Sequence, residues 1–354
     1  MRSDLILTIA HWVSIAVVVL VLFLMIYILF LRALLLLKER RYRELSAVWS
    51  PILLSDSVNT PGRFPYVKYA DRFSFLILWN TLREIKEGDT ERRKGMNRAA
   101  VATGLDRLAR RLLAKRSIRK KLLAVVTLGQ LGDKSQWEKL CQMAVSDHAL
   151  LSLAAIQAMA RIDHEAAVSI YVPLVVRRVD WPVAKVASIL QEIGPDLVSK
   201  PLVDAVMQAP DEEMQRLIPY LETCHAAVAL PAVRRILSEP HDDKVIGPSL
   251  YVIGKFRDEE DLKLVRRYLA HPRWHVRANA AACLGKIGAK NDEEKLVALL
   301  TDPEWWVRYR AAQAIVDLSF SGMQRVHKLK DELKDRYARD ILEQVIVEKG
   351  LIRR

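Results

Sequence analysis

The chain has 354 residues, of which 51% are hydrophobic, and it contains only 13 Gly and 14 Pro. This composition excludes a disordered or fibrous protein and predicts a mostly helical chain that buries a large core. The three cysteines, Cys141, Cys224 and Cys283, are far apart and form no CxxC pair. The sequence therefore predicts neither a disulfide framework nor a thiolate zinc site, and a reducing compartment fits it best.

The first segment predicts a transmembrane anchor. Residues 5–31 carry no Lys, Arg, Asp or Glu, and this run exceeds the roughly 20 residues needed to cross a hydrocarbon core. The alternative is a cleaved signal peptide, whose apolar stretch is only about 7 to 15 residues long. Here the apolar sequence continues through residues 34–37. We therefore expect residues 1–48 to form an anchor with a basic juxtamembrane extension.

The charges that flank this segment predict its orientation. Only Arg2 and Asp4 precede it, whereas five basic residues follow it: Arg32, Lys38, Arg40, Arg41 and Arg43. Basic flanks stay in the cytoplasm. We therefore expect a single-pass protein of the bacterial inner membrane, with its N-terminus outside and its C-terminal part in the cytoplasm.

The excess positive charge lies close to this segment. Residues 32–121 contain 22 Lys and Arg against 9 Asp and Glu, which accounts for the net charge of +13. Each such charge near an anionic leaflet contributes about 1 kcal/mol. Either this is a solvated helix face, or it binds anionic lipid or an acidic partner surface. The candidate residues are Arg40, Arg41, Arg43, Arg92, Arg93, Lys94, Arg98, Arg107, Arg110, Arg111, Lys115, Arg116, Arg119, Lys120 and Lys121.

Two further segments lead into the rest of the chain. Residues 49–68 contain Pro51, Pro61, Gly62 and Pro65 and predict an irregular connector. Residues 69–116 predict basic N-terminal capping helices.

Residues 117–320 contain a repeat of 31 residues, with one step of 32. One position of each repeat, called the repeat anchor below, is always apolar: Leu131, Ile162, Ile193, Cys224, Phe256, Ile287 and Leu318. The residue three positions before each repeat anchor is also apolar. The residue seven positions before it is apolar in six of the seven repeats. These offsets lie on one face of an α-helix, so each repeat has one amphipathic helix.

Each amphipathic helix is followed by a break and a second helical stretch. Gly132, Gly194 and Gly288 follow their repeat anchors and are expected to end the helices. At the helix starts, Asp302 is expected to cap free N–H groups while Pro303 takes the first helical position, and His271 with Pro272 occupies the same places. Such a hairpin cannot bury its apolar face alone and must stack on its neighbours. Within 321–354, residues 323–349 predict a charged capping helix.

The last two repeats, "HPRWHVRANAAACLGKIG" and "DPEWWVRYRAAQAI", resemble HEAT repeats of the short kind. Their pattern is D-P-x-x-x-V-R-x-x-A-A-x-A-L-G-x-I-G. The match is looser around Cys224 and Phe256, where Pro219 and Pro248 lie inside the amphipathic helix. The resemblance implies an α-solenoid that binds other macromolecules. The predicted fold is therefore all-α, with an N-terminal transmembrane helix followed by about seven HEAT-like helix hairpins.

A search for catalytic motifs favours a protein without enzymatic activity. His271 and His275 are four apart, but residue 272 is Pro, so the Glu of an HExxH zinc motif is lacking. Cys224 and Cys283 lie on or beside the apolar stripe and are expected to be core residues. The sequence has no Gly-rich phosphate loop and no GxSxG motif. We therefore expect no metal and no cofactor.

Two ladders of side chains are candidates for protein binding. Trp274 and Trp305 repeat at 31 residues, as do Arg277 and Arg308, and Trp306 adds a further ring. Trp and Arg are enriched where binding energy concentrates. The alternative is that the Trp rings cover helix starts and that the Arg side chains bridge adjacent repeats.

The leading functional hypothesis is a non-enzymatic, membrane-anchored scaffold that positions partners in an inner-membrane complex. The expected partners are integral membrane proteins, such as a glycosyltransferase or a transporter, and anionic lipid. By analogy alone, an accessory subunit of a polysaccharide synthase or export assembly is the specific candidate. A nucleic-acid-binding HEAT-like protein is an alternative, against which a membrane anchor argues. A HEAT-like lyase is another, although no reactive Cys or acid stands out.

Overall fold

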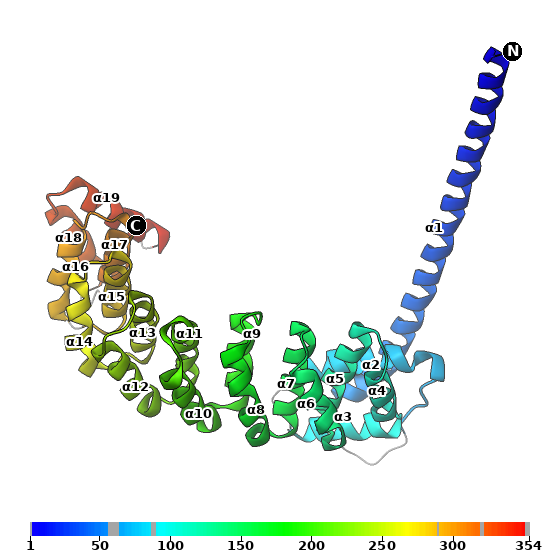
Figure 1. Cartoon of the computed structure of the whole chain (residues 1–354), viewed down its shortest axis with the longest axis horizontal. Coiled ribbons are helices and arrows are strands. Elements are labelled where there is room, and N and C mark those ends of the chain that lie inside the picture. Colours follow the sequence, from blue (N-terminus) through cyan, green and yellow to red (C-terminus); the bar gives the residue numbers. More distant parts are fainter. Residues whose placement is uncertain (1, 56–63, 86–89, 289, 319–321, 351–354) are drawn as a thin grey trace. The chain divides into compact units, whose positions relative to one another are not determined.

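The computed structural model describes residues 2–55, 64–85, 90–288, 290–318 and 322–350. Within these ranges all regular structure is helical, which confirms the all-α prediction (Figure 1). The chain forms two compact units, which are described separately below: Met1–Glu138 and Lys139–Arg354.

Unit 1 begins with the long apolar helix α1 (Arg2–Leu54). All large apolar side chains in residues 18–31 and 34–37 are exposed. Among the described residues, Val18–Leu54 is the one helix long and apolar enough to cross a membrane, and none of its apolar window is buried. The predicted apolar N-terminal helix is therefore present, and its composition is that of a membrane anchor or a signal sequence.

Helix α1 continues further than expected. Residues 49–54 were predicted to belong to an irregular connector, but they are helical and include Pro51. Proline removes one helical hydrogen bond, yet Trp49 and Leu53 are 1% and 0% exposed, and the Trp49 ring lies 4.5 Å from that of Phe75. Burial of these side chains compensates for the lost bond. Residues 64–68 contain no helix, and the centre of the predicted connector, residues 56–63, lies outside the described residues.

The rest of unit 1 packs around α2 (Arg72–Glu84). Trp79 of α2 is fully buried and donates a hydrogen bond to the carbonyl of Met96 in α3 (Thr90–Ala102) at 3.0 Å. Asn80 of α2 donates to Thr127 of α5 (Ile118–Leu131) at 2.9 Å. These bonds tie α2 to α3 and to α5. The elements are η2 (Tyr69–Asp71), α2 (Arg72–Glu84), α3 (Thr90–Ala102), α4 (Leu105–Leu113), α5 (Ile118–Leu131) and η3 (Lys134–Gln136).

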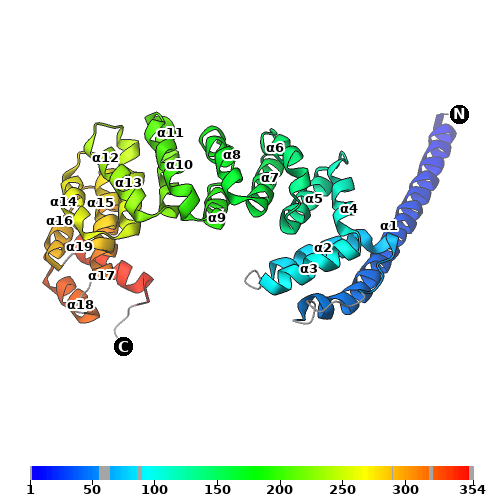
Figure 2. The same ribbon diagram turned by 90° about the horizontal axis from the view of Figure 1, so that it is seen from below.

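Unit 2 consists of helices that succeed one another in chain order in both views (Figures 1 and 2). Helix α6 (Trp137–Ala144) begins just before the boundary between the units. The amphipathic helices are α7 (Ala149–Ile162), α9 (Val183–Ile193), α11 (Asp211–Leu217) with η4 (Ile218–Thr223), α13 (Asp243–Phe256), α15 (Trp274–Ile287) and α17 (Trp305–Asp317). The helices between and after them are α8 (His164–Arg177), α10 (Pro195–Gln208), α12 (Ala226–Ser238), α14 (Leu262–Arg267) with η5 (Glu259–Asp261) and η6 (Tyr268–Ala270), α16 (Glu293–Leu299) with η7 (Lys290–Asp292), α18 (Met323–Glu332) and α19 (Arg336–Glu348).

The 31-residue pattern identifies the core. The residues three before each repeat anchor are at most 2% exposed: Leu128, Met159, Leu190, Leu221, Ile253, Leu284 and Ile315. Those seven before are at most 1% exposed, including the polar Ser249, whose hydroxyl donates to the carbonyl of Val245 at 2.9 Å. The repeat anchors lie nearer the surface, and Leu131, Ile162 and Phe256 are only half-buried.

The two prolines inside amphipathic helices have different effects. Pro219 coincides with the change from α11 to the 3-10 helix η4. The flanking Leu217 and Leu221 nevertheless remain fully buried. Pro248 lies within an uninterrupted α13. The repeat therefore keeps its buried positions even where the helix type changes.

The predicted helix starts are displaced. Helices α15 and α17 begin at Trp274 and Trp305, not at Pro272 and Pro303. The Asp302 carboxylate instead accepts a bond from the N–H of Glu304 at 2.9 Å, in the turn that precedes α17. At the helix ends, Gly132 has the expected left-handed conformation (φ 71°), whereas Gly288 has φ −62° and does not.

Residues 323–349 form two helices, α18 and α19, rather than the single capping helix predicted. The Asp335 carboxylate accepts a hydrogen bond from the N–H of Ala338 at 2.7 Å and so caps α19. Leu342 and Ile346 of α19 are 0% and 3% exposed and lie 31 residues after Ala311 and Ile315. Helix α19 therefore continues the repeat. The sequence pattern missed it because the corresponding repeat anchor is Lys349.

Candidate functional site

The predicted basic residues lie mainly on the surface of unit 1. Arg92 is an exception, because it is 4% exposed and its Nε donates to the carbonyl of Leu53 at 3.2 Å. It joins α3 to the end of α1 and is not available to a lipid or a partner, which corrects that prediction. Lys121 is half-buried, and the other candidates are exposed: Arg40, Arg41, Arg43, Arg93, Lys94, Arg98, Arg107, Arg110, Arg111, Lys115, Arg116, Arg119 and Lys120.

Several of these residues have acidic partners. Exposed pairs join Arg40 to Glu44 at 3.1 Å and Lys94 to Glu91 at 2.8 Å, and such surface pairs contribute little to stability. Arg43 likewise pairs with Glu39 at 3.5 Å.

Arg110 has a structural role. Its Nε lies 2.7 Å from the carboxylate of Asp133, so it links α4 to the turn after α5. Burial opposes the charge of Asp133, yet hydrogen bonds from Ser135 and Arg110 outweigh it and hold the pKa of that carboxyl below its usual range. Arg110 is therefore neutralised within the fold.

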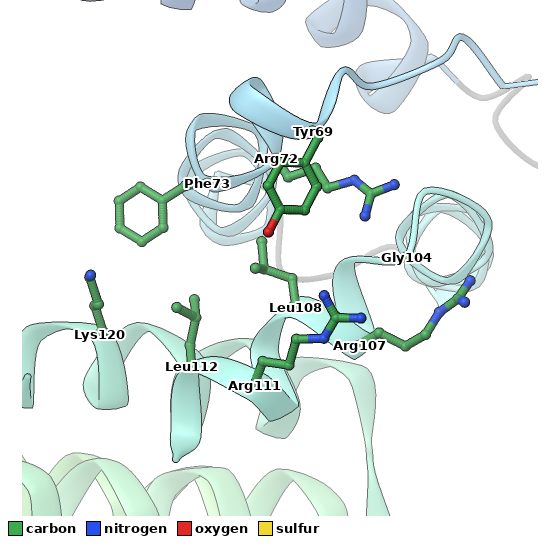
Figure 3. Close-up of a pocket in the computed structure, with 9 residues that line it drawn as sticks. All are labelled: Tyr69, Arg72, Phe73, Gly104, Arg107, Leu108, Arg111, Leu112 and Lys120. Carbon is green, nitrogen blue, oxygen red and sulfur yellow. The ribbon is translucent and has the colours of Figure 1, made fainter. Parts of the chain in front are cut away.

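A cavity of about 380 Å³ opens between the helices of unit 1 (Figure 3). Arginine and lysine side chains from α2, α4 and α5 reach it beside apolar and aromatic groups. In the close-up, Arg107 and Arg111 extend from α4, and Arg72 lies next to Tyr69. The lining residues are Tyr69, Arg72, Phe73, Gly104, Arg107, Leu108, Arg111, Leu112 and Lys120.

The predicted tryptophan ladder is exposed in unit 2. Trp274 and Trp305 are each 40% exposed and Trp306 is 51% exposed. The Trp305 ring stacks on Tyr309 at 5.0 Å and meets Trp306 edge-on at 4.8 Å. Since Tyr309 also donates to Glu348 of α19 at 2.7 Å, Trp305 and Trp306 form an ordered aromatic surface at the start of α17, and Trp274 is exposed at the equivalent position of α15.

The predicted arginine ladder is used within the fold. Arg277 of α15 makes two 2.8 Å hydrogen bonds to the carboxylate of Asp302, which stands at the start of the next repeat. Arg308 donates to the carbonyls of Asp302 and Pro303 at 2.7 and 3.1 Å. Arg277 therefore bridges adjacent repeats, as the alternative interpretation predicted, whereas the Trp rings remain exposed to solvent.

A second bridge between repeats was not predicted. Arg266 of α14 binds both carboxylate oxygens of Asp292, at 2.6 and 2.8 Å, and Asp292 is 0% exposed. Arg234 makes the equivalent contact with Asp261 at 2.6 Å, and Asp261 is 2% exposed. The signal in the sequence is the 31-residue spacing of the two aspartates.

The predicted core cysteines are confirmed as core residues. Burial raises the pKa of Cys224 to about 11 and that of Cys283 to about 12, so both remain thiols at neutral pH. His271 accepts a bond from the N–H of Arg273 at 3.2 Å. Within the described part of the chain, no three His, Cys, Asp or Glu side chains are placed to hold a metal ion.

Comparison with known sequence families agrees with the repeat in one part of the chain. The sequence profile described as HEAT repeats matches residues 230–316. No curated protein sequence matches the chain. Solved structures that resemble it include YibA of Escherichia coli (15% identity, 80% of this chain and 99% of that chain, TM-score 0.32) and human deoxyhypusine hydroxylase in complex with glycerol (18% identity, 79% and 98%, TM-score 0.29).

The profile match covers α13, α15 and most of α17, whose buried positions follow the same 31-residue pattern as the helices before them. Residues 230–316 are therefore similar to HEAT repeats, the helices of the other repeats keep the same buried positions, and among the described residues one long apolar helix lies near the N-terminus.

Proposed function

We propose that this chain is a non-enzymatic scaffold, held in a membrane by α1, whose HEAT repeats bind a protein partner in that membrane. The observation that carries the proposal is the combination in one chain of an exposed membrane-length apolar helix and an exposed aromatic surface on the repeats. HEAT-type repeats contact one another along a stack and leave long surfaces for binding.

The anchor and its flanks support an orientation. The apolar run of α1 that is exposed from Val18 onward ends at Leu37, and Lys38, Arg40 and Arg41 lie in the next four residues. Basic residues after a span favour the cytoplasmic side. The proposed location is a bacterial inner membrane with the repeats in the cytoplasm.

The aromatic surface supports a protein partner. Trp274, Trp305 and Trp306 are large, rigid side chains that lose little conformational entropy on binding. The neighbouring Arg277 and Arg308 already have partners within the fold, so the binding free energy would come mainly from the rings. By analogy, the proposed specific partner is a polytopic subunit of a polysaccharide synthase or export assembly.

Replacing Trp274, Trp305 and Trp306 together with alanine should weaken co-purification of a membrane protein at least about tenfold, since hot-spot residues each contribute about 2 kcal/mol or more. The measurement is affinity purification from detergent-solubilised membranes with quantitative mass spectrometry. The matched control replaces Leu150, Val179 and Val183 with alanine, which are exposed apolar residues elsewhere in unit 2. Equal recovery of the same membrane proteins by all three forms would argue against this surface.

A further inference from the structure

The cavity of unit 1 has a charge distribution that a scaffold role does not require. Arg72, Arg107, Arg111 and Lys120 reach it from three helices, and no acidic residue lines it. Among the described residues, no carboxylate lies within 4.0 Å of any of these four cations. Arg110, one residue before Arg111, is by contrast paired with Asp133. The fold thus neutralises one arginine of α4 and leaves the cations of the cavity uncompensated.

Arg72 provides a second, independent observation. Its Nε is shielded from solvent, yet no group of the described chain accepts its hydrogen bond. Its guanidinium lies over the Tyr69 ring, 5.5 Å from the centroid, which fixes the orientation of the fork. A shielded N–H without an acceptor costs free energy. An acceptor supplied by a ligand would remove that cost.

The remaining walls limit the size and chemistry of this ligand. Phe73, Leu108 and Leu112 supply apolar surface beside the cations. Gly104 lines the cavity and precedes α4, whose first turn has no side-chain cap. A guanidinium group can donate two parallel hydrogen bonds to two oxygens of one phosphate. The cavity volume of about 380 Å³ exceeds that of a bare phosphate ion. A phosphate ester with an apolar or uncharged part would match both the cations and the apolar walls.

We propose that this cavity binds a phosphate ester, with Arg72, Arg107 and Arg111 holding the phosphate oxygens and Phe73 contacting the esterified group. The ester can be the head group of a phospholipid or a soluble phosphorylated compound. This site is independent of the proposed scaffold function, because none of the tryptophans takes part in it.

The test uses the full chain in a neutral detergent. Native mass spectrometry measures binding of dioctanoyl phosphatidylglycerol, with dioctanoylglycerol as the phosphate-free control, and calorimetry measures binding of glycerol 3-phosphate. The cavity variant is R107Q/R111Q and the matched control is K115Q/R116Q. All four side chains are exposed, so both variants lose the same charge from the same region without disturbing the core.

The cavity variant should weaken phosphate binding about tenfold or more, and the control about twofold or less. Arg72→Lys, which keeps the charge but lacks the Nε donor, should also weaken it. Binding of phosphatidylglycerol alone identifies a lipid as the source, and binding of glycerol 3-phosphate identifies a soluble ester. The proposal is overturned if neither phosphate compound binds more tightly than dioctanoylglycerol. Equal losses in the two double variants would also overturn it, since diffuse charge would then explain the binding.

Discussion

Arginine at positions 19 and 23 should remove the chain from the membrane. Val19 and Phe23 are 59% and 65% exposed on α1, and no part of the described fold covers them. Each arginine near the centre of a spanning helix costs about 3 kcal/mol relative to an apolar residue. V19R/F23R should therefore move most of the chain out of the fraction that resists alkaline extraction.

The matched control is V19L/F23L, which keeps the apolar character and should stay in the membrane. The mass of the purified wild-type chain should also be measured, because a cleaved signal sequence has a composition similar to that of an anchor but is missing from the mature chain. Retention of V19R/F23R in the membrane, or a wild-type chain that lacks its first helix, would contradict the anchor.

Arg266→Ala should strongly destabilise unit 2. It removes the bidentate partner of the fully buried Asp292 carboxylate, and breaking a buried ion pair costs about 3–5 kcal/mol. The Arg266 side chain is itself 33% exposed, and Lys295 stays 3.5 Å from Asp292. We therefore expect a loss of about 3 kcal/mol in the free energy of unfolding, at the lower end of that range.

The neighbouring Arg267→Ala is the matched control, because Arg267 is exposed and no described carboxylate pairs with it. Its effect should be below about 0.5 kcal/mol. Both changes in unfolding free energy are measured by chemical denaturation of the full chain in detergent, with circular dichroism as the readout. Similar midpoints for the two variants would show that the bridge between α14 and η7 contributes little to stability.

The repeat could be predicted because helix periodicity is a local property of the sequence. Leu284 and Ala280 lie on one face of α15 whatever surrounds that helix, so their burial follows from spacing alone. The same rule missed α19, where Lys349 replaces the apolar repeat anchor and only Leu342 and Ile346 keep the pattern.

The cavity and the buried bridges depend on tertiary contacts that no spacing within one helix records. Arg72 and Arg111 are 39 residues apart in the sequence and line the same cavity only because α2 and α4 pack together. Arg92 differs in this respect, because Met96, Ala99 and Ala100 lie four, seven and eight residues after it on the buried face of α3, so helical spacing could have identified it as buried. The sequence could therefore locate the basic region, but it could not show which of its residues pair with acids and which line the cavity.

Close packing between repeats shows the same limit. A Cβ on Gly285 would lie 2.6 Å from the Cα of Ala314, so α15 and α17 pack too closely for residue 285 to carry a side chain. The equivalent Gly254, one repeat earlier, would meet Cys283 at 3.3 Å instead. Both glycines occupy the same repeat position, and only the structure distinguishes how much space each one has.

Site-specific photo-crosslinking in intact cells tests the scaffold proposal most directly. A photoreactive phenylalanine analogue at Trp306 should form an adduct with one polytopic membrane protein, because this exposed ring belongs to the proposed binding surface. The same analogue at Val179, which is 80% exposed elsewhere in unit 2, should not form that adduct. If Trp306 yields no adduct, or both positions yield the same soluble proteins, the chain does not act as a membrane scaffold through this surface.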